Sequence, residues 1–291
     1  MPMNVSSDVQ SEKSLNYDSL DWVGMSQIQT SVVLKTGSAE TVTIAAVLDV
    51  GVDLMANHRG IHMSRLYQLH HEHILNKEIS KLHFSNYSRE CLSSHAVLSQ
   101  NFSSKLKLNW PKKTLSLMSN LPGFRNYPVE IIFEKSAAHE NLWLQFEILY
   151  SSTCPQSAGL ALEVLNATQS TPLERLPATP HAQRSRAVVQ VQVSDLNQEI
   201  VESFFTEVEL ALGTPVQTTV KRVDELRFAE LNAENLMFCE DAARKVSQAL
   251  KNNTSCIGFS IRCEHLESLH PHNATSLKKH QYKGPNQLSF C

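Results

Sequence analysis

The chain has 291 residues, of which 42% are hydrophobic and 19% charged, a composition typical of a water-soluble globular protein. Its 26 lysines and arginines nearly balance 29 aspartates and glutamates, so the net charge of −3 excludes a global basic field that would attract nucleic acid or a membrane surface. No apolar run reaches the length of a membrane span, and the N-terminus lacks the apolar segment of a signal peptide. The six cysteines show no CxxC spacing, which predicts a protein of the reducing cytoplasm.

The first half of the chain predicts a disordered tail, a β-hairpin, two helices and a series of strands. Residues 1–15 are polar, and runs rich in Val, Ile and Thr flank a turn at Thr36-Gly37-Ser38 between residues 31 and 54. Helices are expected at 64–77 and 88–100, where apolar residues recur at roughly helical spacing. Further strands are expected at 105–108, 113–118, 128–135 and 141–150.

The second half predicts a similar mixture of elements. The strand alternation ends at Cys154-Pro155, and a proline-containing stretch from Thr171 to Pro180 predicts an exposed loop. Strands are expected at 187–193 and 255–264, and helices at 196–212 and 234–250. Strands and helix pairs in both halves favour an antiparallel α+β fold over a parallel βαβ sheet. Neither phosphate-binding glycine loop, GxGxxG or GxxxxGK[ST], is present.

A short cluster near the C-terminus combines one carboxylate with two imidazoles, in Glu267-Ser268-Leu269-His270-Pro271-His272. Such clusters at strand ends often bind divalent metals or transfer protons. With 13 histidines in the chain, the cluster is also compatible with a polar surface loop that arose by chance. The rest of the chain therefore decides between the two interpretations.

Two upstream segments carry residues of the same chemical kind. The segment from Arg59 to Arg65 places two guanidiniums and the His62 imidazole at an expected helix N-terminus, which suits an anion, although Ser64 would also serve as an ordinary cap. Cys154 ends an expected strand and its thiolate would suit a soft or borderline metal. A lone buried cysteine in a core is the commoner case.

Three further polar segments follow in the second half. The segment His181-Ala182-Gln183-Arg184-Ser185 enters the strongest expected strand, and the basic pair of Lys221-Arg222 precedes Asp224-Glu225. Glu240 points away from the apolar stripe of its helix. It would either pair with Arg244 one turn later or accept two hydrogen bonds from a guanine or pterin.

In combination, these segments resemble the type IB GTP cyclohydrolase I family, the prokaryotic form that makes 7,8-dihydroneopterin triphosphate from GTP. The resemblance covers residues from about 45 to 275 and keeps the order of the motifs. The matching residues are Gly60-Ile61-His62-Met63-Ser64-Arg65, Cys154-Pro155, His181 with Gln183-Arg184-Ser185, Lys221-Arg222 with Asp224-Glu225, Phe238 with Glu240-Asp241, and Glu267-Ser268 with His270 and His272.

The resemblance implies a role for each matching position. The implied metal ligands are Cys154, His181, Glu225 and His270, and the implied catalytic residues are Cys154, Glu267 and His270. Glu240 is implied to anchor the purine, with His62 also in the substrate site. The assignment of Arg65, Arg184, Lys221 and Arg222 to the triphosphate is our own. Whether Glu267 and His270 act as ligands or as proton carriers stays open, and His272 is expected to be a neighbour of the site.

The resemblance also implies a fold, a cofactor and an assembly. The fold is the tunnelling fold, with antiparallel sheets backed by helix pairs in two halves at about 16–150 and 151–291. The cofactor is a divalent metal, Zn²⁺ or Mn²⁺ with Fe²⁺ as a further option, because a mixed S/N/O ligand set admits all three. Such a metal lowers the pKa of bound water from about 15.7 to roughly 7. The implied assembly is a homotetramer with active sites between subunits.

This sequence departs from the family pattern at several places. Gln156 stands where a second cysteine is usual, Val223 stands where proline is usual, and the connection from Cys154 to His181 is longer than the family's. These changes keep every implied ligand but bear on loop geometry and metal preference. The alternative functions are another tunnelling-fold enzyme for a purine or pterin and a non-catalytic nucleotide-binding descendant. A folate role and a role in modified tRNA bases both stay open.

Overall fold

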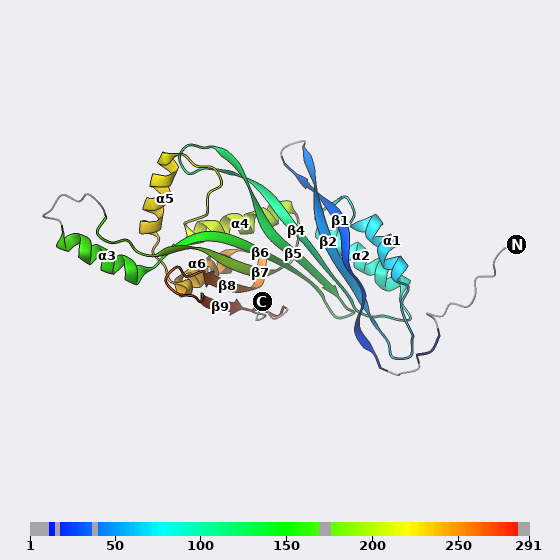
Figure 1. Cartoon of the computed structure of the whole chain (residues 1–291). Helices are drawn as coiled ribbons and strands as arrows, with labels where there is room; N and C mark the ends of the chain where they lie inside the picture. Colours follow the sequence, from blue (N-terminus) through cyan, green and yellow to red (C-terminus); the bar gives the residue numbers. More distant parts are fainter. Residues whose placement is uncertain (1–11, 15–17, 37–39, 169–175, 285–291) are drawn as a thin grey trace. The chain divides into compact units, whose positions relative to one another are not determined.

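A computed structural model describes residues 12–14, 18–36, 40–168 and 176–284 (Figure 1). The chain forms two compact units, each assembled from separate stretches of sequence. Unit 1 comprises residues 1–109, 130–144 and 195–198, and unit 2 comprises residues 110–129, 145–194 and 199–291. Three long strands contribute to both units: β4 (Phe102–Leu115), β5 (Pro122–Lys135) and β6 (Glu140–Thr153). The units therefore do not coincide with halves divided at residue 150.

Unit 1 is a sheet backed by two helices. Its strand order is β3-β1-β2-β4-β5-β6, in which β1 (Leu20–Lys35) pairs antiparallel with β2 (Thr41–Leu54) and parallel with β3 (Lys77–Glu78). The helices α1 (Met63–His73) and α2 (Lys81–Ser94) pack against each other. Its fully buried large side chains include Tyr87, Phe84, Phe102 and Phe133.

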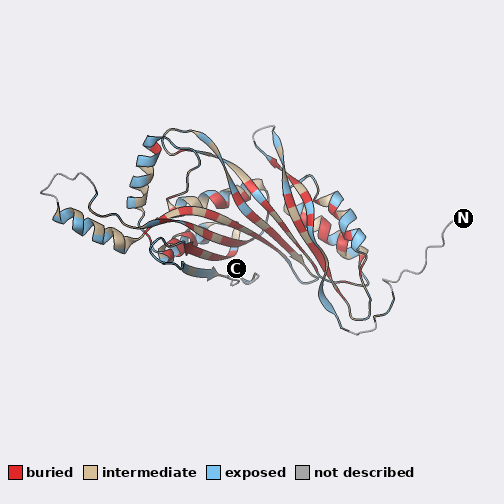
Figure 2. Ribbon diagram, viewed as in Figure 1, coloured by how far each residue is buried: buried red, intermediate tan, exposed pale blue. Residues whose placement is uncertain are grey.

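Unit 2 continues the strand order as β4-β5-β6-β7-β8-β9. In it β7 (Ala182–Val193), β8 (Cys256–His265) and β9 (Ala274–His280) form an antiparallel meander. Two helices with one buried face back the sheet, α4 (Gln198–Leu212) and α6 (Cys239–Asn252), as the red stripes in Figure 2 show. The other two helices are α3 (Pro155–Ala167) and α5 (Arg222–Glu234).

The structure confirms most expected elements and corrects others. The helix expected at 88–100 is α2, which begins earlier because Ser80 caps it by accepting a hydrogen bond from the His83 amide at 3.4 Å. The strand expected at 113–118 is the end of β4 rather than a separate strand. The helices α3 and α5 and the strand β9 were not anticipated.

The expected N-terminal tail is only partly described. Residues 1–11, the turn at 37–39 and residues 171–175 of the expected loop lie outside the described residues. Within the tail, however, Lys13 forms a β-bridge with His58 and Glu12 accepts a hydrogen bond from Arg59 at 2.8 Å. Residues 12–14 are therefore ordered, contrary to the expectation for 1–15. Among the described helices, none has the length and apolarity required to cross a membrane.

The buried imidazole of His70 makes the stability of unit 1 depend on pH. Its Nε2 lies 2.7 Å from Thr30 Oγ1, and burial, with a smaller contribution from His71, lowers its pKa from 6.5 to about 4. Between these values the unfolded chain binds a proton that the folded chain does not, so stability falls as the pH decreases from 6.5 to 4. We expect the melting temperature of His70→Gln to fall less over this window than that of the parent, by calorimetry. His139 is exposed, so His139→Gln should keep the parental dependence of melting temperature on pH. The same dependence in His70→Gln would show that His70 is not the group responsible.

Candidate functional site

The first part of the site lies where β6 ends and β7 begins. Cys154 follows the last residue of β6 and is the N-cap of α3, whose first residue is Pro155. The Cys154 amide donates to the His181 carbonyl oxygen at 3.2 Å, and the His181 amide donates to Ser157 Oγ at 3.2 Å. These backbone contacts hold two predicted ligands side by side although 27 positions separate them in the sequence.

Two acceptor oxygens face the same ring nitrogen of the His181 imidazole. Its Nδ1 lies 3.1 Å from Gln183 Oε1 and 3.5 Å from the Glu267 carboxylate. The His181 and Glu267 side chains are 18% and 12% exposed, so the pair is largely withdrawn from solvent. The structure thus brings Glu267, from the C-terminal cluster, to the predicted ligand His181.

The C-terminal cluster occupies the loop between β8 and β9. The Glu267 amide donates to the His265 carbonyl oxygen at 2.9 Å, which turns the chain directly after β8. The rings of His270 and His272 stack at 5.0 Å between centroids, and both residues are exposed. His270 is therefore exposed in this loop and packed on His272.

The residues predicted around Glu225 lie at the start of α5. Lys221 is its N-cap, and Arg222 and Glu225 are exposed in its first turn. The other end of the helix contacts the Cys154 region, because Thr153 Oγ1 lies 3.4 Å from Asn232 Oδ1. Seven residues of α-helix separate Glu225 from Asn232, about 10 Å along the axis. Within one chain, Glu225 is therefore held away from Cys154 and His181.

A different group of side chains brings three potential metal-ligating atoms close together. In the part of the chain that the structure describes, the group whose ligand atoms lie within 4.8 Å of one another is Glu72, His73 and Glu90, in unit 1. There the His73 Nε2 lies 2.8 Å from a Glu90 oxygen, an ion pair between α1 and α2. Within a single chain, the ligand atoms of Cys154, His181, Glu225 and His270 do not form such a group of mutually close atoms.

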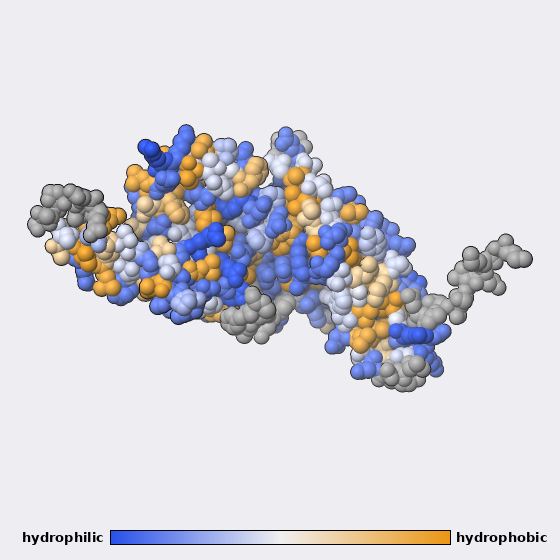
Figure 3. Space-filling model, viewed as in Figure 1, coloured by the Kyte–Doolittle hydropathy of each residue, from blue (hydrophilic) through white to orange (hydrophobic). Residues whose placement is uncertain are grey.

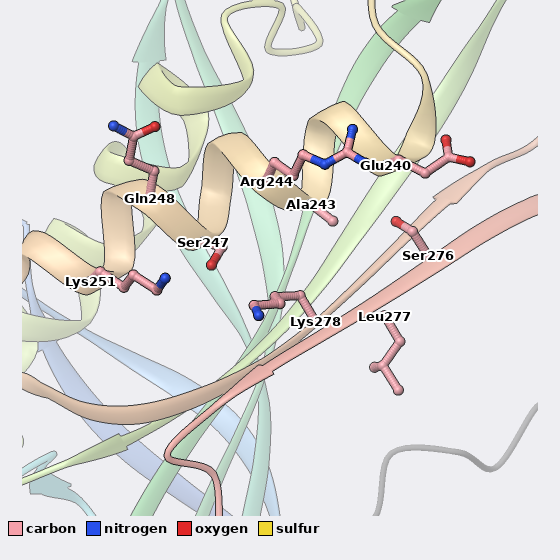
Figure 4. A pocket seen from close by; sticks show the side chains of 9 residues that line it. All are labelled: Glu240, Ala243, Arg244, Ser247, Gln248, Lys251, Ser276, Leu277 and Lys278. Carbon is pink, nitrogen blue, oxygen red and sulfur yellow. The ribbon is translucent and has the colours of Figure 1, made fainter.

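Glu240 lines a cavity of about 480 Å³ between α6 and β9 (Figure 4). Glu240 lies at one end of this cavity and Lys251 at the other, with Lys278 on β9 projecting toward the helix. Arg244 lines it too and forms an ion pair with Asp241 at 2.9 Å, not with Glu240. The carboxylate of Glu240 is exposed, and it remains available as a hydrogen-bond acceptor beside a basic cavity.

The remaining predicted substrate residues belong to different elements. His62 is the N-cap of α1 and Arg65 lies in its first turn, where it donates to the Ser94 carbonyl oxygen at 2.6 Å. Both belong to unit 1. Arg184 is an exposed residue of β7 in unit 2.

Asp224 supports this region but was not predicted as a site residue. It is fully buried and accepts hydrogen bonds from the amides of Met118 (2.7 Å), Ser119 (2.9 Å) and Lys221 (2.8 Å), and from the Ser119 hydroxyl (2.5 Å). Burial alone would raise the pKa of Asp224, but these hydrogen bonds hold it below its usual range. Asp224 thereby ties the start of α5, with Lys221, to the turn between β4 and β5. The sequence shows only charged residues at the start of a helix, which does not indicate that Asp224 bonds to a distant turn.

Comparisons with known proteins show the family of this chain. Residues 7–276 match the family model described as type I GTP cyclohydrolase folE2. The chain is 38% identical to GTP cyclohydrolase FolE2 of Pseudomonas putida (strain GB-1), with 90% of this chain and 92% of that protein aligned. It is 36% identical to GTP cyclohydrolase FolE2 of Klebsiella pneumoniae, with 92% and 95% aligned.

A solved structure agrees with the expected fold. The uricase of Arthrobacter globiformis superposes with a TM-score of 0.51 at 9% sequence identity, covering 92% of this chain and 95% of that one. At this identity the likeness concerns the fold alone, and it confirms the tunnelling fold with its antiparallel sheet and helices. With the family match over nearly the whole sequence, this chain belongs to the folE2 family of type I GTP cyclohydrolases.

Proposed function

We propose that this chain is the type IB, prokaryotic form of GTP cyclohydrolase I and converts GTP and water to 7,8-dihydroneopterin triphosphate and formate. The reaction is the first step of folate biosynthesis. The observation that carries the proposal is that three separate segments meet here. A backbone hydrogen bond joins Cys154 to His181, and the His181 imidazole lies 3.5 Å from the Glu267 carboxylate. A thiol, an imidazole and a carboxylate together offer the means for metal-assisted hydrolysis of a purine ring.

The donor set fits a divalent metal. Because Nδ1 of His181 faces Gln183 and Glu267, we infer that its Nε2 is the nitrogen that binds the metal. We infer that Cys154, His181 and Glu225 hold the metal, joined by His270. Sulfur, nitrogen and oxygen donors suit Zn²⁺, and the imidazole and carboxylate groups also suit Mn²⁺ or Fe²⁺. When bound, the metal would supply an activated water at neutral pH for attack on C8 of guanine.

The protein side chains would bind the substrate and move its protons. Glu240 accepts hydrogen bonds from the N1–H and the exocyclic amino group of guanine, which orients the ring. Glu267 and the exposed His270 carry protons to the imidazole nitrogen released when the ring opens, a contribution of typically 10²–10⁴ in rate. The basic residues Lys221, Arg222, Arg184 and Arg65 bind the triphosphate, because the net charge of the whole chain, −3, does not attract an anion. His62 also belongs to the substrate site.

We infer that the complete site forms only in a homo-oligomer, expected to be a tetramer. Two observations support this inference: the separation of Glu225 from Cys154 along α5, and the exposure of α3 and α5. The helix α3 has no buried residue, and its apolar side chains face solvent: Leu160, Leu162 and Val164 are 53%, 56% and 42% exposed (Figures 2 and 3). An apolar helix of this length is stable when a neighbour covers it. A second copy would cover it and bring its own Glu225 to the site.

The proposal also includes a location. The described cysteines Cys91, Cys154, Cys239, Cys256 and Cys263 are free thiols. Free thiols are typical of the reducing cytoplasm, where GTP is available. We therefore place the enzyme in the cytoplasm.

Glu240→Gln provides the test of substrate recognition. The change replaces one acceptor oxygen by a donor, so the amide repels a guanine edge that presents two donors. We expect kcat/KM for GTP to fall roughly 10²- to 10³-fold, measured by the fluorescence of the oxidised neopterin product after reconstitution with Zn²⁺, Mn²⁺ or Fe²⁺. Glu234→Gln, on the exposed face of α5, should keep parental activity. Absence of product from the parent with all three metals would refute the proposed function.

A further inference from the structure

A buried chain of polar groups ends at the His181 imidazole. Gln183 Nε2 lies 2.7 Å from Ser152 Oγ, which in turn lies 2.7 Å from Ser185 Oγ. At its other end, Gln183 Oε1 lies 3.1 Å from His181 Nδ1. Ser152 and Ser185 are fully buried and Gln183 is 8% exposed, so these groups must satisfy one another.

The position of these groups on β7 is unusual for a buried strand face. The residues Gln183, Ser185, Ala187, Val189, Val191 and Val193 alternate along β7 and all are buried. Four of the six are apolar, and the two polar residues are those nearest His181. Buried amides and hydroxyls cost free energy unless they are paired, and apolar side chains would fill a strand face without that requirement. The polar pair at this end of the strand therefore indicates a role at the site.

The Glu267 carboxylate indicates which nitrogen of His181 carries the proton and how the Gln183 amide is oriented. A carboxylate only accepts, and its oxygen lies 3.5 Å from His181 Nδ1, which favours a proton on Nδ1. Gln183 must then present its oxygen to Nδ1 and its amino group to Ser152, as the structure has it. Ser152 Oγ accepts from this amino group and shares a second hydrogen bond with the Ser185 hydroxyl. Reversing the amide would place its N–H against the Nδ1 proton.

We propose that Gln183 is a positioning residue that, through Ser152, holds His181 as the Nδ1-protonated tautomer. A neutral imidazole has one N–H, so this tautomer leaves the lone pair on Nε2, the nitrogen that would bind the metal. The inference rests on the proposed function insofar as it assigns His181 as a metal ligand. Gln183 does not touch substrate or metal; it acts by orienting the ring and selecting the nitrogen that binds.

Two substitutions at Gln183 separate its acceptor role from its packing. Gln183→Leu removes the acceptor for Nδ1, whereas Gln183→Glu keeps an acceptor oxygen at nearly the same place, and Ser152 can donate to it. Gln190→Leu is the matched control, because Gln190 is a buried amide on the same strand, 2% exposed and bonded to Tyr282 rather than to the site. Loss of packing alone would affect Gln183→Leu and Gln190→Leu alike.

Metal affinity of the full-length apo-protein provides the first readout, by competition with a chromophoric chelator for Zn²⁺. We expect Gln183→Leu to weaken Zn²⁺ binding about 10- to 100-fold, and Gln183→Glu and Gln190→Leu to stay within about threefold of the parent. Parental affinity in Gln183→Leu, or equal weakening in Gln183→Leu and Gln183→Glu, would overturn the proposal.

The tautomer of His181 provides a second readout that requires no metal. In apo-protein labelled with nitrogen-15 histidine, the signals that disappear in His181→Gln are those of His181, and their couplings to the ring protons identify the protonated nitrogen. We expect Nδ1–H in the parent and Gln183→Glu, and a mixture of tautomers in Gln183→Leu. An Nε2–H tautomer in the parent would overturn the proposal. Parental Zn²⁺ affinity in His181→Ala would instead refute His181 as a ligand and leave the tautomer result standing.

Discussion

Cys154→Ala is expected to lose the bound metal and to lower the rate of GTP turnover at least about 10³-fold. Cys154 supplies the one sulfur donor of the proposed ligand set, and its backbone amide already fixes the position of His181 through the His181 carbonyl. Alanine keeps the backbone contact and the start of α3 while removing the sulfur. Metal content by atomic emission, together with product fluorescence, measures both expected losses on one preparation.

Cys239→Ala is the control for the loss of a thiol as such. Cys239 lies at the start of α6, is 5% exposed and donates to the Glu240 carboxylate at 3.3 Å. Burial, followed by its contact with Glu240, raises the pKa of this thiol to about 11, so it is protonated and unsuited to metal binding at neutral pH. Its alanine variant should keep parental metal content. Full activity and full metal content in Cys154→Ala would show that the metal is bound elsewhere.

Asp224→Ala is expected to lower the melting temperature by roughly 5–10 °C and to raise the KM for GTP. The change leaves three backbone amides and the Ser119 hydroxyl without their acceptor in a fully buried place. It also releases the start of α5, which carries Lys221, Arg222 and Glu225. Calorimetry and steady-state kinetics measure the two effects separately.

Asp241→Ala is the matched control, because Asp241 occupies the equivalent position in the first turn of α6. Its side chain is 40% exposed, accepts from the Phe238 amide at 3.1 Å and pairs with Arg244. A smaller loss of stability is therefore expected. Because the pKa of Asp224 is lowered on folding, its contribution to stability is complete above the unfolded value of about 3.9 and is lost as the pH falls below it. Equal losses in the two variants at neutral pH would contradict a special role for Asp224.

Local patterns account for the elements that the sequence predicted well. The strand at β7 alternates buried and partly exposed residues, and the apolar residues of α4 and α6 recur on one face, so their periods were visible in the sequence. The helices α3 and α5 were missed for the converse reason. Neither buries an apolar stripe in this chain, because α3 has no buried residue and α5 buries only Asp224. A helix without a buried face carries no periodic signal.

For the candidate site, too, the sequence indicated some features and the structure supplied others. The order of Cys154, His181, Glu225, Glu240 and Glu267 along the chain was enough to indicate the family, because each residue type and spacing is a property of the sequence. The contact between His181 and Glu267 was expected only as convergence, and the structure supplies its distance. Glu225, in contrast, is held at the far end of α5 within one chain.

By itself the sequence determined the fold class and the family, and it predicted which side chains carry the chemistry. Only the tertiary structure decided how these side chains are held. Gln183 reads as one polar residue in an alternating strand, and its partners Ser152 and His181 became known only when β6 and β7 were placed beside each other. Asp224 likewise became a buried acceptor only when α5 met the turn after β4. The physical reason is that burial and hydrogen-bond partners depend on strand register and helix packing between distant segments, which local residue patterns do not encode.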